Sequence, residues 1–216
     1  MTATLYCFAQ SGNAYKVALM LELSAHAWKP VFVDFFNGGH RAPDYLALNP
    51  MGEVPLYVEG DLALSQSGVI LTHLAELTGK HGGTSAEEKR EILRWLLWDN
   101  HKFSANVSIH RFLANFLPEH QRQPDVIAFH AARQKQAMKV LERHLATRDW
   151  VAAAGPTIAD FSLCGYLYYP EPFGFDRADW PHINAWLDRI AALPGWKHPH
   201  DLMPGSAAER AERRNP

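Results

Sequence analysis

Cysteine is scarce in this chain of 216 residues, which contains only Cys7 and Cys164. Two cysteines are too few for a disulfide-rich scaffold, and their apolar surroundings favour a reducing compartment, which predicts a cytoplasmic location. No apolar run approaches the roughly 18 residues that a membrane span needs. The first ten residues lack a basic segment followed by an apolar one. We therefore expect no membrane partner and no signal peptide.

An excess of charge of one sign is also lacking. The 21 Lys and Arg residues nearly balance the 23 Asp and Glu residues, so the formal net charge is −2. This composition lacks the basic stripe of a nucleic-acid binder, so we expect no nucleic-acid partner. The chain has no GxxxxGK[ST] loop for phosphate, no GxSxG elbow and no cysteine pairs, and its histidines lack zinc-like spacing. We predict no metal site.

Apolar residues are plentiful, at 47% of the chain, and in the first eighty residues their spacing alternates between two periods. Strand-like runs with β-branched and aromatic residues alternate with segments of helical spacing. The last of these helices ends at Gly79, as expected for a glycine C-cap. The strand-like runs lie at residues 4–9 and 30–36 and in a hairpin within 55–65, and the helical segments lie at 12–25, around 42–48 and at 67–79. The resulting order, β-α-β-α-β-β-α, is the thioredoxin-type order.

The pattern changes after residue 80. The stretch "KHGGTSAEEKRE" combines two glycines with a new helix start, which is typical of a linker. Helical periodicity without any clear strand follows, including one continuous helix of over 25 residues and a helix capped by Thr157 and Asp160. We predict an α/β plus all-α protein. It has a thioredoxin-like domain at 1–80, a linker at 81–86 and a helical-bundle domain at 87–216 with a polar C-terminal tail.

Pro55 opens the strand of "MGEVPLYV", although proline cannot donate a ladder hydrogen bond. One interpretation is an ordinary trans proline at the start of an edge strand. The thioredoxin-type order favours another: a cis proline, which leaves the backbone of Val54 free to pair with a bound peptide as a sheet edge would.

Three ordered motifs carry a resemblance to a known family. They are "LYCFAQSGNAYKVALMLE", "NPMGEVPLYVEGDLALSQSGVILTHL" and "TIADFSLCGYL". With them the chain resembles the cytosolic glutathione transferases over almost its whole length. The resemblance implies glutathione as co-substrate, a binding site in the cleft between the two domains, a homodimer and a role in detoxification.

Ser11 and Asn13 lie between the first strand and the first helix, where ordinary N-cap residues also lie. The segment is similar to the serine-type pattern of theta- and nu-like transferases. By that resemblance, Ser11 donates a hydrogen bond to the glutathione sulfur and Asn13 assists. Tyrosine-type classes have their tyrosine where this chain has Cys7, so that mechanism is not expected here. A nucleophilic role for Cys7 is a less favoured alternative to a small core residue.

Further residues are implied to bind glutathione. The N-terminus of the helix at Ser67 suits the γ-glutamyl carboxylate, although Ser67 also reads as a plain cap. Gln66 can hold the head group but brings no charge for its ammonium. Asp99 of a partner subunit could supply that charge, although a solvated charge on a helix is the favoured interpretation of Asp99. His40 could contact the glycine carboxylate, or it could be an exposed loop histidine. The turn Glu53, Val54 and Pro55 completes the implied set.

The acceptor substrate is expected to meet the helical domain. Four side chains there follow roughly helical spacing and are candidates for the acceptor site, although such a stripe is more often core. They are Trp98, Phe103, Asn106 and His110.

We predict a glutathione S-transferase that stabilises the glutathione thiolate for attack on a small electrophile. One alternative is a nu-like glutathione-dependent disulfide-bond oxidoreductase, whose substrate would be a disulfide. A second is a non-catalytic interaction protein of the same fold, which would have lost Ser11, Gln66 and Ser67. A third, a thiol oxidoreductase using Cys7, is weakened by the lack of a C-x-x-C motif.

Overall fold

The chain divides into two compact units in the computed structural model, which describes residues 2–206. The first unit comprises Met1–Lys80 and Leu193–Pro216, and the second comprises His81–Ala192. The division at residue 80 falls where the sequence predicts the linker. The last stretch differs from the prediction, because residues 193–206 belong to the first unit instead of the helical one. Most of the predicted polar tail, from residue 207, lies outside the described residues.

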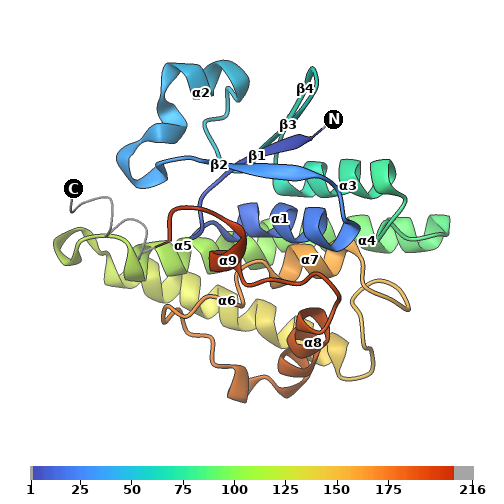
Figure 1. The fold of residues 1–216 in the computed structure, drawn as a ribbon. Coiled ribbons are helices and arrows are strands. Elements are labelled where there is room, and N and C mark those ends of the chain that lie inside the picture. The colour runs from blue at the N-terminus through green and yellow to red at the C-terminus, as the bar shows by residue number, and fades with distance from the viewer. Residues whose placement is uncertain (1, 207–216) are drawn as a thin grey trace. The chain divides into compact units, whose positions relative to one another are not determined.

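The first unit has a four-stranded mixed sheet in the order β2-β1-β3-β4. Strands β1 and β2 are parallel, whereas β3 is antiparallel to β1 and β4 is antiparallel to β3. Helices α1 and α3 lie on one face of the sheet and α2 lies on the other (Figure 1). The predicted thioredoxin-like order is confirmed. Its elements are β1 (Ala3–Cys7), α1 (Gly12–Ser24), β2 (Trp28–Phe32), α2 (Pro43–Leu48), β3 (Leu56–Glu59), β4 (Leu62–Ser65), α3 (Ser67–Thr78) and, from the returning segment, α9 (Pro199–Leu202).

Strand β1 shows why the sheet has helices on both faces. Ala3, Leu5 and Cys7 are fully buried, while the alternate residues are half-buried. Tyr6 points to the opposite face from Cys7. Its ring meets that of Tyr45 in α2 edge-on, with centroids 6.0 Å apart. Because side chains alternate along a strand, one sequence supplies apolar contacts to both helical layers.

Strand β2 begins at Trp28, two residues before the predicted start, and it contains Pro30. The amide of Val33, just after β2, donates to the carbonyl of Cys7 in β1. Backbone groups alternate in direction along a strand, so the amides of Val31 and Lys29 also face β1, whereas the nitrogen of Pro30 faces away from it. On this edge strand the missing N–H of Pro30 therefore costs no ladder bond, and the proline discourages pairing with another strand. The predicted strand ends earlier than expected, because Phe35–Asn37 form a 3₁₀ turn.

The second unit is helical throughout its regular elements, as predicted. Two of its helices start with capping boxes, Ser85 with Glu88 and the predicted Thr157 with Asp160. In each, the cap side chain and the third helical residue satisfy backbone donors reciprocally. The helices are α4 (Ala86–Trp98), α5 (Ser104–Asn115), α6 (Pro124–Leu145), α7 (Ile158–Cys164) and α8 (Pro181–Ala191).

The continuous helix predicted at the start of this unit is interrupted. Residues Asp99–Phe103 form a π-helical segment between α4 and α5. The carboxylate of Asp99 is fully buried and accepts hydrogen bonds from the hydroxyls of Ser104 at 2.6 Å and Ser162 at 2.5 Å. A π-helical insertion within an α-helix has no signature in the apolar periodicity, which is why the pattern missed it.

Candidate active site

The strand register of the first unit brings three distant loops to the same end of the sheet. Tyr6 of β1 pairs with Leu56 of β3, and Leu56 pairs with Ser65 of β4. The segment after β1, the segment before β3 and the segment after β4 therefore leave the sheet at the same end. These segments carry three groups predicted from the sequence: Ser11, the Val54–Pro55 turn and the Gln66–Ser67 pair.

Ser11 is held in a defined place at the start of α1. Its amide donates to the carbonyl of Phe8 at 3.0 Å, which closes a turn, and its Oγ accepts from the amide of Ala14 at 3.1 Å. Ser11 is therefore the N-cap of α1, and its hydroxyl proton is available to a further acceptor. Asn13 lies in the first turn, and its Oδ1 is buried with no hydrogen-bond partner among the described residues.

Cys7 is unsuited to act as a nucleophile. Its side chain is fully buried, and burial raises the pKa of the thiol from 9.0 to about 12. The thiolate is the reactive form of cysteine, so this residue is inert at neutral pH. It behaves as the small core residue favoured by the sequence.

The loop before β3 is fixed by side chains from α2 and from its own start. The predicted cis Val54–Pro55 bond is confirmed. The carbonyl of Glu53 accepts from the Tyr45 hydroxyl at 2.6 Å and from the Asn49 amide at 2.8 Å. Burial raises the pKa of Tyr45 to about 12, so this hydroxyl keeps its proton. The backbone N–H and C=O of Val54 have no hydrogen-bond partner among the described residues.

Gln66 adopts an unusual backbone conformation at the N-terminus of α3. Its φ is +68°, a region that non-glycine residues rarely occupy and that often marks functional positions. Its Nε2 donates to the carboxylate of Glu53 at 2.7 Å and approaches the sulfur of Met51 at 3.4 Å. Ser67 follows as the first residue of α3 and is 5% exposed.

His40 is not an exposed loop histidine. It is 8% exposed, its ring stacks on Phe35 at 4.2 Å, and its Nδ1 is buried without a hydrogen-bond partner among the described residues. Burial and the neighbouring positive charge of Arg41 lower the pKa of His40, while the backbone of Phe35 acts in the opposite direction. The lowered pKa favours the neutral imidazole at pH 7, which has one N–H donor and one acceptor nitrogen.

The four acceptor-site candidates of the second unit fall into two groups. Trp98 and Asn106 line an open pocket of about 410 Å³. Phe103 is fully buried, and His110 is buried with its Nδ1 bonded to Gln134 at 2.9 Å. Only the first pair is placed to meet a small molecule in this pocket.

Sequence reasoning missed most of the side chains that line this pocket. Phe129 is 58% exposed, and Arg133 lies over its ring at 5.4 Å from the centroid. The spacing of these residues in α6 is the available signal, since positions three to four apart share a helix face. The missed lining residues are Lys102, Phe129, Ala132, Arg133, Gln136, Ala137 and Val140.

Asp99 is unsuited to the role considered for it at a partner's glutathione. Asp99 is not a solvated helix charge either, because its carboxylate is fully buried inside the second unit and accepts from the two serine hydroxyls described above. A buried carboxylate that accepts several hydrogen bonds has a structural explanation. The negative charge nearest to Gln66 along the hydrogen-bond network is instead that of Glu53.

Residues 2–206, which the structure describes, contain neither a cluster of metal-binding side chains nor a membrane-spanning helix. No group of three or more His, Cys, Asp or Glu side chains there could hold a metal ion. No helix in the same range is long and apolar enough to cross a membrane.

Comparisons with known proteins agree with this architecture. The sequence matches the profiles "Glutathione S-transferase, N-terminal domain" over residues 1–76 and "Glutathione S-transferase, C-terminal domain" over residues 109–194. It is 32% identical over 203 residues to glutathione S-transferase 3 of Zea mays, covering 89% of this chain and 90% of that protein. It is 26% identical over 194 residues to the disulfide-bond oxidoreductase YfcG of Escherichia coli, covering 87% of this chain and 89% of that protein.

A solved structure gives the same result. The glutathione S-transferase from Xanthobacter autotrophicus Py2 matches with a TM-score of 0.84 at 35% identity, covering 94% of this chain and 97% of that one. The similarity extends over nearly all of both chains and is not limited to the thioredoxin-like part. The chain therefore belongs to the glutathione S-transferase family.

Proposed function

We propose that this glutathione transferase binds glutathione at the sheet edge of the first unit and uses Ser11 to stabilise the thiolate. One observation carries the proposal: the Ser11 hydroxyl, the unpartnered backbone of Val54 and the helix N-terminus at Ser67 meet at one end of the sheet. They offer a hydroxyl donor, a peptide edge and an anion site, which match the thiol, the backbone and a carboxylate of glutathione.

The chemistry needed is modest. A free thiol has a pKa of about 8.5, so little thiolate is present at neutral pH. A hydrogen bond from Ser11 Oγ–H to sulfur, together with the N-terminal dipole of α1, favours the charged form. Because Ser11 Oγ already accepts from the amide of Ala14, its proton is directed away from the helix. The thiolate then attacks an electrophilic carbon, forms the C–S bond and displaces a leaving group or adds to a double bond.

The γ-glutamyl end needs both a donor for its carboxylate and an acceptor for its ammonium. Ser67 offers its amide and hydroxyl at the start of a 12-residue helix. Glu53 supplies the acceptor: its backbone is fixed by Tyr45 and Asn49, and its carboxylate is held by Gln66. His40, neutral at pH 7, donates to the glycine carboxylate.

A disulfide substrate is the second candidate, favoured by the similarity to YfcG, which is named a disulfide-bond oxidoreductase. In that reaction the glutathione thiolate attacks a disulfide sulfur and one thiolate leaves. A second glutathione then releases the other half as a thiol and forms oxidised glutathione. Turnover of a hydroxyethyl disulfide but not of a chlorodinitrobenzene would assign this subtype, and the opposite result would assign the transferase subtype.

Four finer predictions accompany the proposal. The serine-type, theta- or nu-like subclass rests on the residues around Ser11 and Asn13. A homodimer is supported by exposed apolar side chains on α4 and α6, where Leu93, Leu97 and Phe129 are each more than half exposed. A cytoplasmic location is supported by the small number of cysteines, two in 216 residues, both of them buried. A role in detoxification follows from the family resemblance alone.

Calorimetry with glutathione tests the proposal directly. We expect saturable binding to the wild type, clearly weaker binding to Ser67→Ala, and binding with a smaller thiolate fraction for Ser11→Ala. Ser85→Ala is the matched control, because it removes a helix N-cap serine in the second unit. No binding to the wild type at millimolar glutathione would reject the proposal, and binding indifferent to Ser67 would reject the site.

A further inference from the structure

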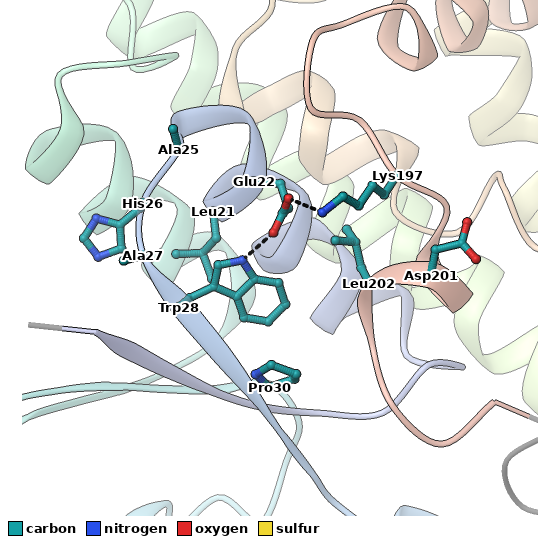
Figure 2. A pocket seen from close by; sticks show the side chains of 10 residues that line it. All are labelled: Leu21, Glu22, Ala25, His26, Ala27, Trp28, Pro30, Lys197, Asp201 and Leu202. Carbon is teal, nitrogen blue, oxygen red and sulfur yellow. Dashed lines mark hydrogen bonds and ion pairs between the residues drawn. The ribbon is translucent and has the colours of Figure 1, made fainter.

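The returning C-terminal segment, residues 193–206, runs along the first unit and is called the strap below. Near its start, the carbonyl of Lys197 accepts from the Tyr15 hydroxyl at 2.9 Å. The ammonium of Lys197 binds the carboxylate of Glu22 at 2.8 Å, and the other oxygen of Glu22 accepts from the Trp28 indole at 2.8 Å (Figure 2). The strap is thus anchored to α1 and, through Glu22, to β2.

The end of the strap reaches the loop that carries Ser11. The amide of Ala9 donates to the carbonyl of Pro204 at 2.8 Å. The side-chain amide of Gln10 donates to the carbonyl of Gly205 at 3.0 Å. Ala9 and Gln10 are the two central residues of the turn that Ser11 closes by donating to Phe8. Both central residues of this turn are therefore held by a segment almost two hundred positions away in sequence.

Gly205 fits its place tightly. Its φ is +84°, and a Cβ added there would lie 2.2 Å from Cε2 of Phe32, the last residue of β2. Because Phe32 pairs with Cys7 at the end of β1, Gly205 of the strap lies at the same end of the sheet as the loop that carries Ser11. Any larger residue at position 205 must displace the Phe32 ring or the strap itself.

We propose that the strap positions the turn that presents Ser11, with Pro204 and Gly205 as positioning residues for its hydroxyl. This inference rests on the role proposed for Ser11. A hydroxyl that stabilises a thiolate must hold its distance and direction, and a displacement of about 1 Å can cost on the order of 100-fold in rate. At Ser11 the turn is tied to Phe8 by the Ser11 amide and to α1 by the amides of Ala14 and Tyr15. The two strap bonds add contacts at the central residues of the turn, Ala9 and Gln10.

Gly205→Ala is the test variant, and Gly195→Ala is its matched control. Gly195 also lies in the strap with a positive φ, +91°, but the nearest atom to an added Cβ is 3.5 Å away. Both substitutions place alanine at a positive φ and so introduce similar backbone strain. Only Gly205→Ala is expected to displace the strap from the turn at Ala9 and Gln10. Gln10→Met adds a third variant, which removes one strap bond and leaves the strap sequence intact.

The readouts separate positioning from folding. For Gly205→Ala we expect the thiol pKa of bound glutathione, followed by thiolate absorbance, to rise by about one unit as stabilisation is lost. We expect kcat to fall about 10- to 100-fold while the Kd for glutathione changes by less than about threefold. Gln10→Met should show the same changes in smaller degree. Gly195→Ala should match the wild type in thiol pKa and kcat.

Amide hydrogen exchange provides a test that needs no glutathione. Exchange at Ser11 and Ala14 should be faster in Gly205→Ala and Gln10→Met than in Gly195→Ala. Exchange and thiol pKa unchanged in both test variants, with wild-type melting temperatures, would overturn the proposal. Failure of the wild type to bind glutathione would instead reject the proposed function, and the exchange result would still decide whether the strap orders the turn.

Discussion

Replacing Glu53 by glutamine is expected to weaken glutathione binding through the loss of one charge. The backbone of Glu53 is held by Tyr45 and Asn49, and its carboxylate by Gln66 at 2.7 Å, so the substitution keeps the loop and changes only the charge. Two unit charges about 4 Å apart gain about 1 kcal/mol in water and about 4 kcal/mol near a protein surface. Because Glu53 is exposed, we take about 1–2 kcal/mol, which raises Kd roughly 5- to 30-fold.

An analogue of glutathione without its α-amino group makes the assay specific. Wild-type protein should bind this analogue more weakly than glutathione, and Glu53→Gln should bind both alike. Isothermal titration at constant ionic strength measures the four affinities. An equal loss of affinity for both ligands would show that Glu53 does not meet the ammonium, and an unchanged affinity for glutathione would refute the reasoning.

The double exchange of Glu53 and Gln66 is the internal control. Gln66→Glu alone places two carboxylates where an amide now donates to one, which should weaken binding or leave one of them protonated. Glu53→Gln with Gln66→Glu restores one amide and one carboxylate in the reverse order. We expect the double variant to bind glutathione better than either single variant, and additivity of the two losses would contradict a shared role.

Three further results are expected. Cys7→Ala should retain turnover. Burial raises the thiol pKa from 9.0 to about 12, so the protonated thiol stabilises the fold below about pH 9, and this contribution is lost as the pH rises toward 12. In Cys7→Ala this contribution should be absent from the pH dependence of the melting temperature. His40→Gln should keep most glutathione affinity at pH 7, whereas His40→Leu should lose about tenfold in titrations, because a neutral donor suffices for the glycine carboxylate. Asp99→Ala should lower the free energy of unfolding in urea by about 3 kcal/mol, because Ser104 and Ser162 lose their buried acceptor. It should leave the affinity for glutathione unchanged. A loss of affinity without a loss of stability would show that Asp99 does contact the ligand.

The local patterns of the first eighty residues predicted the sheet and its helices because each element repeats its own period. Alternation in β1 and the glycine at the end of α3 are examples, and both features are local in sequence. The predicted ends of strands were less accurate where a residue fits both the start and the interior of a strand. Pro30 was expected to begin β2, yet it lies inside the strand, where its nitrogen faces the open edge and no ladder hydrogen bond is lost.

Features that depend on contacts between residues distant in sequence could not be predicted from the sequence pattern. The strap contains prolines and glycines without periodicity, so nothing local assigns it to the first unit, and its bond from Gln10 joins residues 195 positions apart. The place of Asp99 likewise depends on Ser162, which is 63 positions away. The pocket beside Trp98 needs the facing side chains of α6, and their helical spacing alone could not show that they line an open space.

Ser11 shows why a capping interpretation and a catalytic one need not compete. A cap uses the oxygen of the side chain as an acceptor, here for the amide of Ala14, and stabilisation of a thiolate uses its proton as a donor. The first interaction fixes the oxygen and so restricts where the second can point. A serine at this place in the chain is thus fixed by the helix that it caps, and the strap fixes the turn before it. If Ser11 stabilises a thiolate as proposed, these contacts position its oxygen before any ligand binds, which is the preorganisation that such a donor needs.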